Sequence, residues 1–157
     1  MTEAESLMQL ALKAAWEGIS QGQSPFGCAI RIGRKVVAVA HNHVLASTDI
    51  TAHAEIVALR EACRNVGNIH LTGALVASTC EPCPMCIAAL HWARVETVYY
   101  GSTIDDATAI GFNELTLPAK ELLRIGKSNV NLVPGVLKQE CQQLFQEWRA
   151  SHAYHPY

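Results

Sequence analysis

Two short motifs, His53-Ala54-Glu55 and Pro82-Cys83-Pro84-Met85-Cys86, constrain the fold of this chain more than any other feature. Together they supply one imidazole and two thiolates, the ligands that a tetrahedral zinc ion prefers. With His53, Cys83 and Cys86 as ligands, the fourth position is left for water, which is the arrangement of a catalytic rather than a structural site. The fold must therefore bring two segments about thirty residues apart to one metal.

The spacing of the cysteines predicts a helix. Cys83 and Cys86 are three residues apart, so they share one face of a helix. Pro82 and Pro84 suit its first turn, where a missing N–H costs little. The N-terminus of a helix also favours thiolates, because its dipole and free N–H groups stabilise negative charge.

The first motif predicts a second helix N-terminus. His53 and Glu55 are two residues apart and can converge only from the first turn of a helix. Asp49 and Thr51 are N-cap residue types, so we expect the helix to begin just after them. The zinc site is then the meeting point of two helix N-termini.

The charge count assigns a role to Glu55. Neutral His53 and two thiolates balance the charge of Zn²⁺, so Glu55 is not needed as a ligand. A carboxylate beside a metal-held water is suited to move its protons. Either motif by itself has other interpretations, since a C-x-x-C also occurs in redox pairs and in structural four-cysteine zinc sites. The sequence has no second C-x-x-C to complete such a site.

Length and composition predict one folded domain over residues 1–157, with 50% hydrophobic and 17% charged residues. No apolar run reaches the roughly 18 residues of a membrane span, and the acidic N-terminus differs from a signal peptide. We therefore expect a cytoplasmic protein with no membrane partner. The net charge of −2, without a basic cluster, argues against a nucleic-acid partner.

Hydrophobic periodicity predicts helices that alternate with strands. Helices are expected over residues 3–20, 52–65, 82–93, 118–125 and 135–150, and strands over 26–32, 35–40, 74–78, 95–100 and 129–132. The first two strands form a hairpin at Gly33-Arg34, whereas helices separate the later strands. We predict an α/β fold, a three-layer α/β/α sandwich with a mixed five-stranded sheet.

These motifs resemble those of the cytidine deaminase superfamily, and within it those of the bacterial guanine deaminases. The zinc motifs are shared by every branch. More discriminating segments are Pro25-Phe26-Gly27, His41-Asn42, Trp92-Ala93-Arg94 and Ala109-Ile110-Gly111-Phe112. The resemblance spans nearly the whole chain. It implies a cytidine deaminase-like fold and zinc-dependent hydrolysis of a purine base, guanine, to xanthine and ammonia.

The resemblance also implies two catalytic acids. Glu55 would be the proton shuttle, and Glu114 would engage the exocyclic amine. Asn113-Glu114 stands where an Asp-rich pair is common in the family, so the geometry at the amine is left open.

Substrate-binding roles are implied in the same way. Asn42 would hydrogen-bond the purine, Phe26 and Trp92 would wall its ring, and the backbone of Ala54 would contact the base. Guanine deaminases resemble this chain in ending with an aromatic segment that crosses to a neighbouring subunit. Residues 151–157, through Tyr157 or Tyr154, would then close the partner's site in a homodimer.

Three other functions remain as alternatives. A tRNA adenosine deaminase shares the zinc core and predicts a basic, RNA-binding face. A deaminase of guanosine, cytidine or cytosine differs only in the shape of the pocket. A non-enzymatic protein that uses zinc for folding predicts no effect of a Glu55→Gln substitution.

Overall fold

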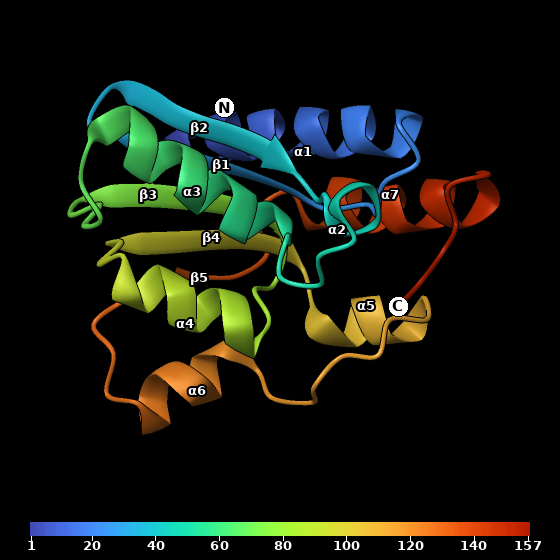
Figure 1. Ribbon diagram of the computed structural model, residues 1–157. Helices are drawn as coiled ribbons and strands as arrows, with labels where there is room; N and C mark the ends of the chain where they lie inside the picture. Colours follow the sequence, from blue (N-terminus) through green and yellow to red (C-terminus); the bar gives the residue numbers. More distant parts are fainter.

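The computed structural model describes residues 1–157 and is built on a five-stranded sheet in the order β2-β1-β3-β4-β5 (Figure 1). The strands are β1 (Gly27–Ile32), β2 (Lys35–His41), β3 (Ala74–Cys80), β4 (Thr97–Ser102) and β5 (Asn131–Val133). Strand β1 pairs antiparallel with β2 and β3, whereas β4 pairs in parallel with β3 and β5. The mixed five-stranded sheet expected from the sequence is therefore confirmed.

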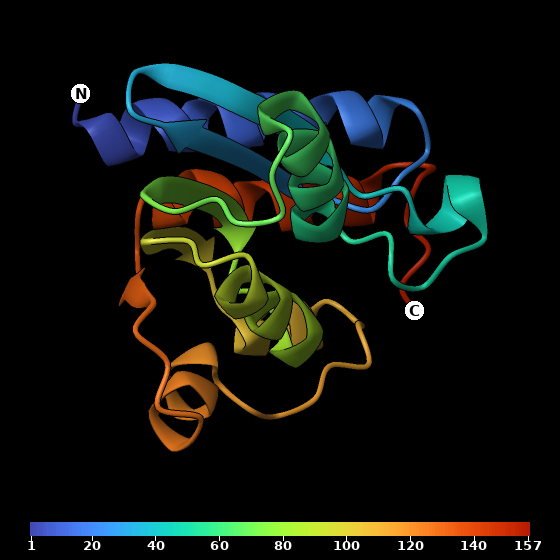
Figure 2. The same ribbon diagram turned by 60° about the vertical axis from the view of Figure 1, so that its left-hand side comes forward.

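Helices cover both faces of this sheet, as Figures 1 and 2 show. They are α1 (Glu3–Ser20), α2 (Val44–Ser47), α3 (Ala54–Val66), α4 (Pro84–Trp92), α5 (Ile104–Ala109), α6 (Ala119–Ile125) and α7 (Lys138–Ala150). Helices α1 and α7 pack on one face, and α3 and α4 pack on the other. None of the helices has the length and apolar character needed to span a lipid bilayer.

The alternation of side chains along β3 explains the three layers. Ala74 and Val76 are buried in the hydrophobic cluster that includes α3 and α4. Ala77, which points the other way, is buried in the cluster that includes α1 and α7. The central strand is thus apolar on both faces, which requires a helical layer on each side.

Two short helices, α2 and α5, were not expected from the sequence. Helix α5 begins with a capping box in which Thr103 accepts from the N–H of Asp106 and Asp106 accepts from the N–H of Thr103. The Thr-x-x-Asp pattern was therefore a readable signal for this helix.

The predicted N-cap residues of α3 are wrong. The helix begins at Ala54, and its N-cap is His53, which makes no side-chain capping bond. Asp49 instead accepts hydrogen bonds from the backbone and hydroxyl of Thr51 in the preceding loop. A local turn satisfies both residues before the helix starts.

Strand direction gathers the candidate residues at one edge of the sheet. Because β2 and β3 both run antiparallel to β1, they point the same way, and β4 is parallel to β3. The segments that follow these three strands therefore begin at the same edge. They carry Asn42 and His53 after β2, Cys83 after β3, and Glu114 after β4.

Candidate active site

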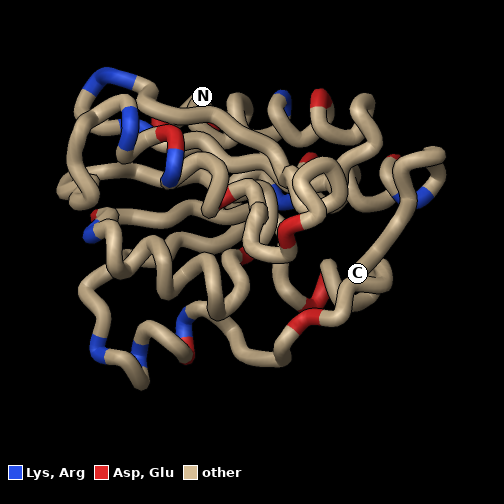
Figure 3. Tube along the Cα trace, viewed as in Figure 1, with Lys and Arg blue, Asp and Glu red and all other residues tan.

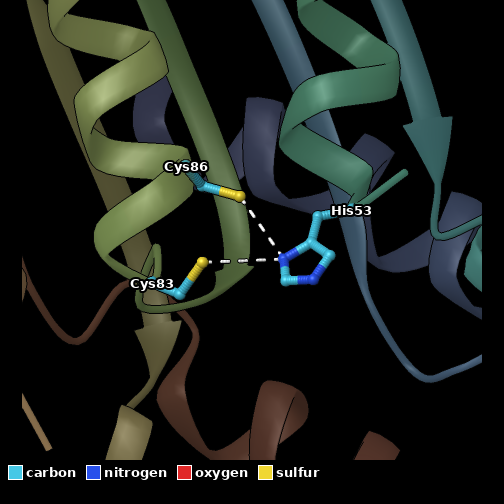
Figure 4. Close-up of side chains that lie close together, drawn as sticks. All are labelled: His53, Cys83 and Cys86. Carbon is cyan, nitrogen blue, oxygen red and sulfur yellow. Dashed lines mark hydrogen bonds between the residues drawn. The ribbon is translucent and has the colours of Figure 1, made fainter. Parts of the chain in front are cut away.

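Two helix N-termini hold the metal-ligand set, as the sequence predicted (Figure 4). His53 is the N-cap of α3, Cys83 is the N-cap of α4, and Cys86 lies in the first turn of α4. Nδ1 of His53 lies 3.6 Å from Sγ of Cys83 and 3.5 Å from Sγ of Cys86. Zinc bound to nitrogen at about 2.05 Å and sulfur at about 2.3 Å in a tetrahedron would separate them by about 3.6 Å. The geometry therefore fits zinc.

The protonation of Cys83 also suits a metal, whereas the hydrogen bond with Cys83 and burial raise the pKa of the Cys86 thiol. A hydrogen bond from Cys86 lowers the pKa of Cys83 to about 4, although burial opposes this shift. Cys83 is therefore a thiolate at neutral pH. A zinc ion held by these residues would act as a Lewis acid, which in sites of this type lowers the pKa of a bound water to about 7.

Glu55 lies beside the ligands in the first turn of α3 and is buried. Its Oε1 accepts a hydrogen bond of 2.9 Å from the hydroxyl of Ser78 on β3. Burial raises the pKa of Glu55 above its ordinary value. A fixed carboxyl whose pKa is raised is suited to take up and release protons.

A small cavity lies against the metal-ligand set. Its lining residues come from five segments of the chain: Phe26, His53, Glu55, Cys80, Glu81, Cys83, Phe112, Glu114 and Tyr157. The cavity has a volume of about 30 Å³, which is too small for a purine. A recess of about 320 Å³, bounded by Ile50, Met85 and Leu115 among others, lies next to it and shares His53, Cys83 and Tyr157.

Glu114 reaches this cavity from the loop between α5 and α6. Burial, followed by the nearby Cys83 thiolate, raises the pKa of Glu114 to about 7. The site therefore contains two carboxyl groups, Glu55 and Glu114, whose pKa values are both raised. Such pairs are typical of sites that move protons.

The other predicted pocket residues differ in how close they lie to the cavity. Phe26 lines it and packs against Phe112, with ring centroids 5.0 Å apart. Asn42 is fully buried, and its Nδ2 donates to the hydroxyl of Tyr157 at 2.7 Å. Ala54 is the first residue of α3, so its N–H lies outside the hydrogen-bond ladder of the helix.

The structure does not bring Trp92 to the cavity. Trp92 ends α4, at the opposite end from Cys83, and its side chain is 79% exposed. It borders a separate surface recess with Ile69 and Arg94. Within one chain, Trp92 therefore does not wall the site.

Residues 151–157 fold back over the site of their own chain. Besides its bond to Asn42, Tyr157 accepts a backbone hydrogen bond of 2.9 Å from the N–H of Asn113. The hydroxyl of Tyr154 donates to the carbonyl of Ile110 at 2.9 Å. Gly111 has a φ of 116°, and a Cβ there would lie 3.0 Å from the Tyr154 hydroxyl, so this contact requires glycine.

Sequence reasoning gave no role to three residues of the site. Ser78 fixes Glu55, Phe112 stacks on Trp148 at 5.1 Å and lines the cavity, and Glu81 is a buried carboxylate of its wall. Phe112 lay within a segment that carried the resemblance, which was a signal for it.

Comparison with known proteins identifies the family. The model of the cytidine and deoxycytidylate deaminase zinc-binding region matches residues 1–102. The chain belongs to this deaminase family. It is a zinc-dependent hydrolase, and His53, Cys83 and Cys86 form its metal site.

Relatives of this deaminase include enzymes with different substrates. The guanine deaminase of Bacillus subtilis is 35% identical over 146 residues, which cover 92% of this chain and 93% of that protein. A tRNA-specific adenosine deaminase of the same organism is 34% identical over 141 residues, covering 90% and 85%. The solved guanine deaminase from Nitrosomonas europaea superimposes with a TM-score of 0.87 at 25% identity, covering 96% of this chain and 87% of that one. The cytidine deaminase-like fold is thus confirmed.

Proposed function

We propose that this deaminase hydrolyses guanine to xanthine and ammonia. The observation that carries the proposal is the presence of two carboxyl groups, Glu55 and Glu114, in one cavity beside the zinc ligands. One carboxyl is enough to move a proton from water. The second carboxyl group, Glu114, is then available to hydrogen-bond a group of the substrate.

The edge of guanine that carries its amine offers that partner. Guanine presents two adjacent donors there, the exocyclic amine and the neighbouring ring N–H. Adenine and cytosine instead present an amine next to a ring nitrogen that accepts. An ionised carboxylate only accepts hydrogen bonds. Glu114 can therefore accept from both donors of guanine, whereas in adenine and cytosine it would face the lone pair of the ring nitrogen and be repelled.

Asn42 provides a donor that is held in one orientation. Its Oδ1 accepts from the N–H of Val44 at 2.9 Å, and its amide NH₂ points to Tyr157, which lines the cavity. This NH₂ is suited to an acceptor of the purine, such as its carbonyl oxygen or a ring nitrogen. Phe26 and Phe112 supply apolar walls for the flat ring.

The proposed proton transfers use the two carboxyl groups in turn. Water adds its oxygen to the carbon that bears the amine, and Glu55 carries a proton from that water to the adjacent ring nitrogen. Glu114 holds the amine and the ring N–H. The proton of the added hydroxyl group then passes through Glu114 to the amine, the carbon–nitrogen bond breaks, ammonia leaves, and a carbonyl group remains on the carbon.

The covered cavity means that substrate entry requires movement of residues 151–157. We further propose that the enzyme is a homodimer in which these residues are exchanged between subunits. Residues 151–157 make their contacts at the cavity, among them those of Tyr157 with Asn42 and Asn113. These contacts do not depend on which of two chains supplies the segment. A partner's segment that reached the same place would make the same bonds.

Similarity to tRNA-specific adenosine deaminases favours RNA as a second candidate substrate. Two features favour a neutral small molecule instead. Neither the cavity nor the adjoining recess has a Lys or Arg among its lining residues. Most Lys and Arg residues lie at the end of the molecule away from residues 151–157 (Figure 3). A bound polyanion would meet few cations near the site.

A substrate panel tests the proposed activity. Ammonia release by the purified, zinc-loaded enzyme would be followed with guanine, guanosine, adenine, cytosine, cytidine and a tRNA anticodon stem-loop. We expect turnover of guanine, with at least about a hundredfold lower kcat/KM for the other bases. Turnover of the stem-loop without turnover of guanine would assign the enzyme to RNA.

Mixing two inactive variants tests segment exchange. One variant carries Glu55→Gln with an intact segment, and the other lacks residues 153–157 but keeps Glu55. If the segment is exchanged, co-refolded mixtures regain activity because one site receives both parts. If each chain closes its own site, the mixture stays as inactive as its components.

A further inference from the structure

Glu81 is a buried carboxylate that no step of the proposed reaction uses. It follows β3 directly and is 8% exposed. Its backbone N–H donates to the carbonyl of Ser102 at 2.8 Å, which ties it to the end of β4. Glu81 therefore stands on the rigid edge of the sheet and also borders the cavity.

The carboxylate joins both ends of the segment that carries Glu114. Oε2 of Glu81 accepts from the N–H of Ile104, the first residue of α5, at 2.9 Å. Oε1 accepts from the N–H of Ala119, the first residue of α6, also at 2.9 Å. Figure 1 shows the loop that runs from α5 along the lower side of the view to α6. Each oxygen has its own partner, so the two bonds fix the carboxylate and both helix starts.

The part of the loop around Glu114 has few other anchors. On its N-terminal side, Phe112 bonds to Ala107 and Asn113 bonds to Tyr157. Residues 114–117 make no backbone hydrogen bond. Helix α6 has Pro118 as its N-cap, which provides no side-chain cap. The bond from Ala119 to Glu81 is therefore the first hydrogen bond after Glu114 that ties the chain to another segment of the fold.

We propose that Glu81 is a positioning residue, which sets the place of the Glu114 carboxyl by holding the starts of α5 and α6 to the edge of the sheet. The inference rests on the proposed role of Glu114 at the substrate amine. Because Glu81 directly precedes the Pro82-Cys83 segment, one side chain connects the metal-binding turn to the loop that contacts the substrate.

A Glu81→Gln substitution removes one of the two acceptors at nearly constant shape. The new NH₂ group would face an N–H group, so one helix start loses its partner. We expect hydrogen exchange of peptides covering residues 110–119 to become faster, while peptides from α7 stay unchanged. We expect kcat/KM for guanine, measured per bound zinc, to fall by about tenfold to a hundredfold.

Two further variants separate the effect of losing the Glu81 hydrogen bonds from the effects of removing a charge and of disturbing the fold. Ala119→Pro removes the N–H that Glu81 accepts and leaves Glu81 itself intact. Proline is tolerated at the first position of a helix, and Pro118 already has an extended ψ of 142°. This variant should loosen the same peptides. Glu121→Gln, a change on α6 at a half-buried side chain that pairs with Arg124, is the matched control and should alter nothing in the loop.

A double-mutant cycle with Glu114→Gln decides whether Glu81 acts through Glu114. If it does, Glu81→Gln lowers kcat/KM in the native background and changes it by less than about twofold when Glu114 is already Gln. Equal losses in both backgrounds, or unchanged exchange over residues 110–119, would overturn the inference. Lack of guanine turnover by the native enzyme would reject the proposed function instead, and the exchange comparison would still decide the role of Glu81.

Discussion

The amide nitrogen of Asn42 donates a hydrogen bond of 2.7 Å to the hydroxyl of Tyr157. The amide oxygen of Asn42 accepts from the N–H of Val44, so its NH₂ group is the part that can donate to a ligand. A bound purine would either accept from the second hydrogen of this NH₂ group or displace Tyr157 from the first. The covered state of the site is one that substrate must open.

Removing residues 153–157 should expose the metal. The segment covers a cavity next to His53 and Cys83, so its loss gives a chelator direct access. We expect zinc extraction, followed with a colorimetric chelator, to be at least about tenfold faster. Tyr157→Phe, which loses one hydrogen bond of about 1 kcal/mol, should give about a fivefold effect. His155→Ala, exposed and without a side-chain bond, is the control, and an equal rate in all variants would contradict the covering role.

Glu55→Gln should give a folded, zinc-loaded and nearly inactive enzyme. Glu55 is the carboxyl placed to carry protons, and such groups contribute about a hundredfold to ten-thousandfold to rate. We expect kcat to fall by that factor while metal content by mass spectrometry stays at the native value. Glu61→Gln, exposed on the same helix, should keep full activity. An active Glu55→Gln enzyme would refute its role as the proton carrier.

Cys83→Ser should abolish zinc binding, because the hydroxyl replaces a thiolate whose pKa is about 4. Zinc stabilises only the folded chain, so we expect the variant, or the chelated native protein, to melt about 5–15 °C lower. Calorimetry with and without added zinc measures the difference. Cys63→Ser, away from the site on α3, should bind zinc and melt normally.

Glu114→Gln should stabilise the metal-free protein at alkaline pH. The pKa of Glu114 is raised from 4.5 to about 7, so the folded chain holds its proton more tightly than the unfolded chain. Native stability therefore falls as pH rises from about 4.5 to 7 and stays lower above that window. We expect Glu114→Gln to be more stable by about 1–3 kcal/mol at pH 8 and equal at pH 4.5. Urea unfolding with chelator present tests this, and the same difference at both pH values would contradict it.

The metal site was predictable because its geometry is local. A spacing of three positions places Cys83 and Cys86 on one helical face, and convergence of His53 and Glu55 requires a first turn. The sheet was predictable as well, since short runs of mostly apolar residues mark β1, β2 and β3. What failed was the exact start of α3, where a turn between Asp49 and Thr51 took the residues expected as caps.

The substrate side of the site was harder to predict, because its residues are placed by long-range contacts. Trp92 stands nine positions beyond Cys83 on a helix, about 14 Å along its axis, so spacing alone argued against a shared pocket. In the sequence, nothing distinguishes Glu81 from an acidic residue on the surface. Its two acceptor contacts, with Ile104 and Ala119, appear only once the chain is folded.

The residues that hold the metal and the residues that contact the substrate lie on different parts of the chain, and this has an evolutionary consequence. The metal ligands and Glu55 sit at the starts of α3 and α4, whereas Glu114 and Tyr157 belong to a loop and a terminal segment outside the sheet. Mutation can thus remodel what enters the pocket without disturbing the reaction centre. A single ancestral scaffold could diversify from one nitrogenous base to another by changing its periphery alone.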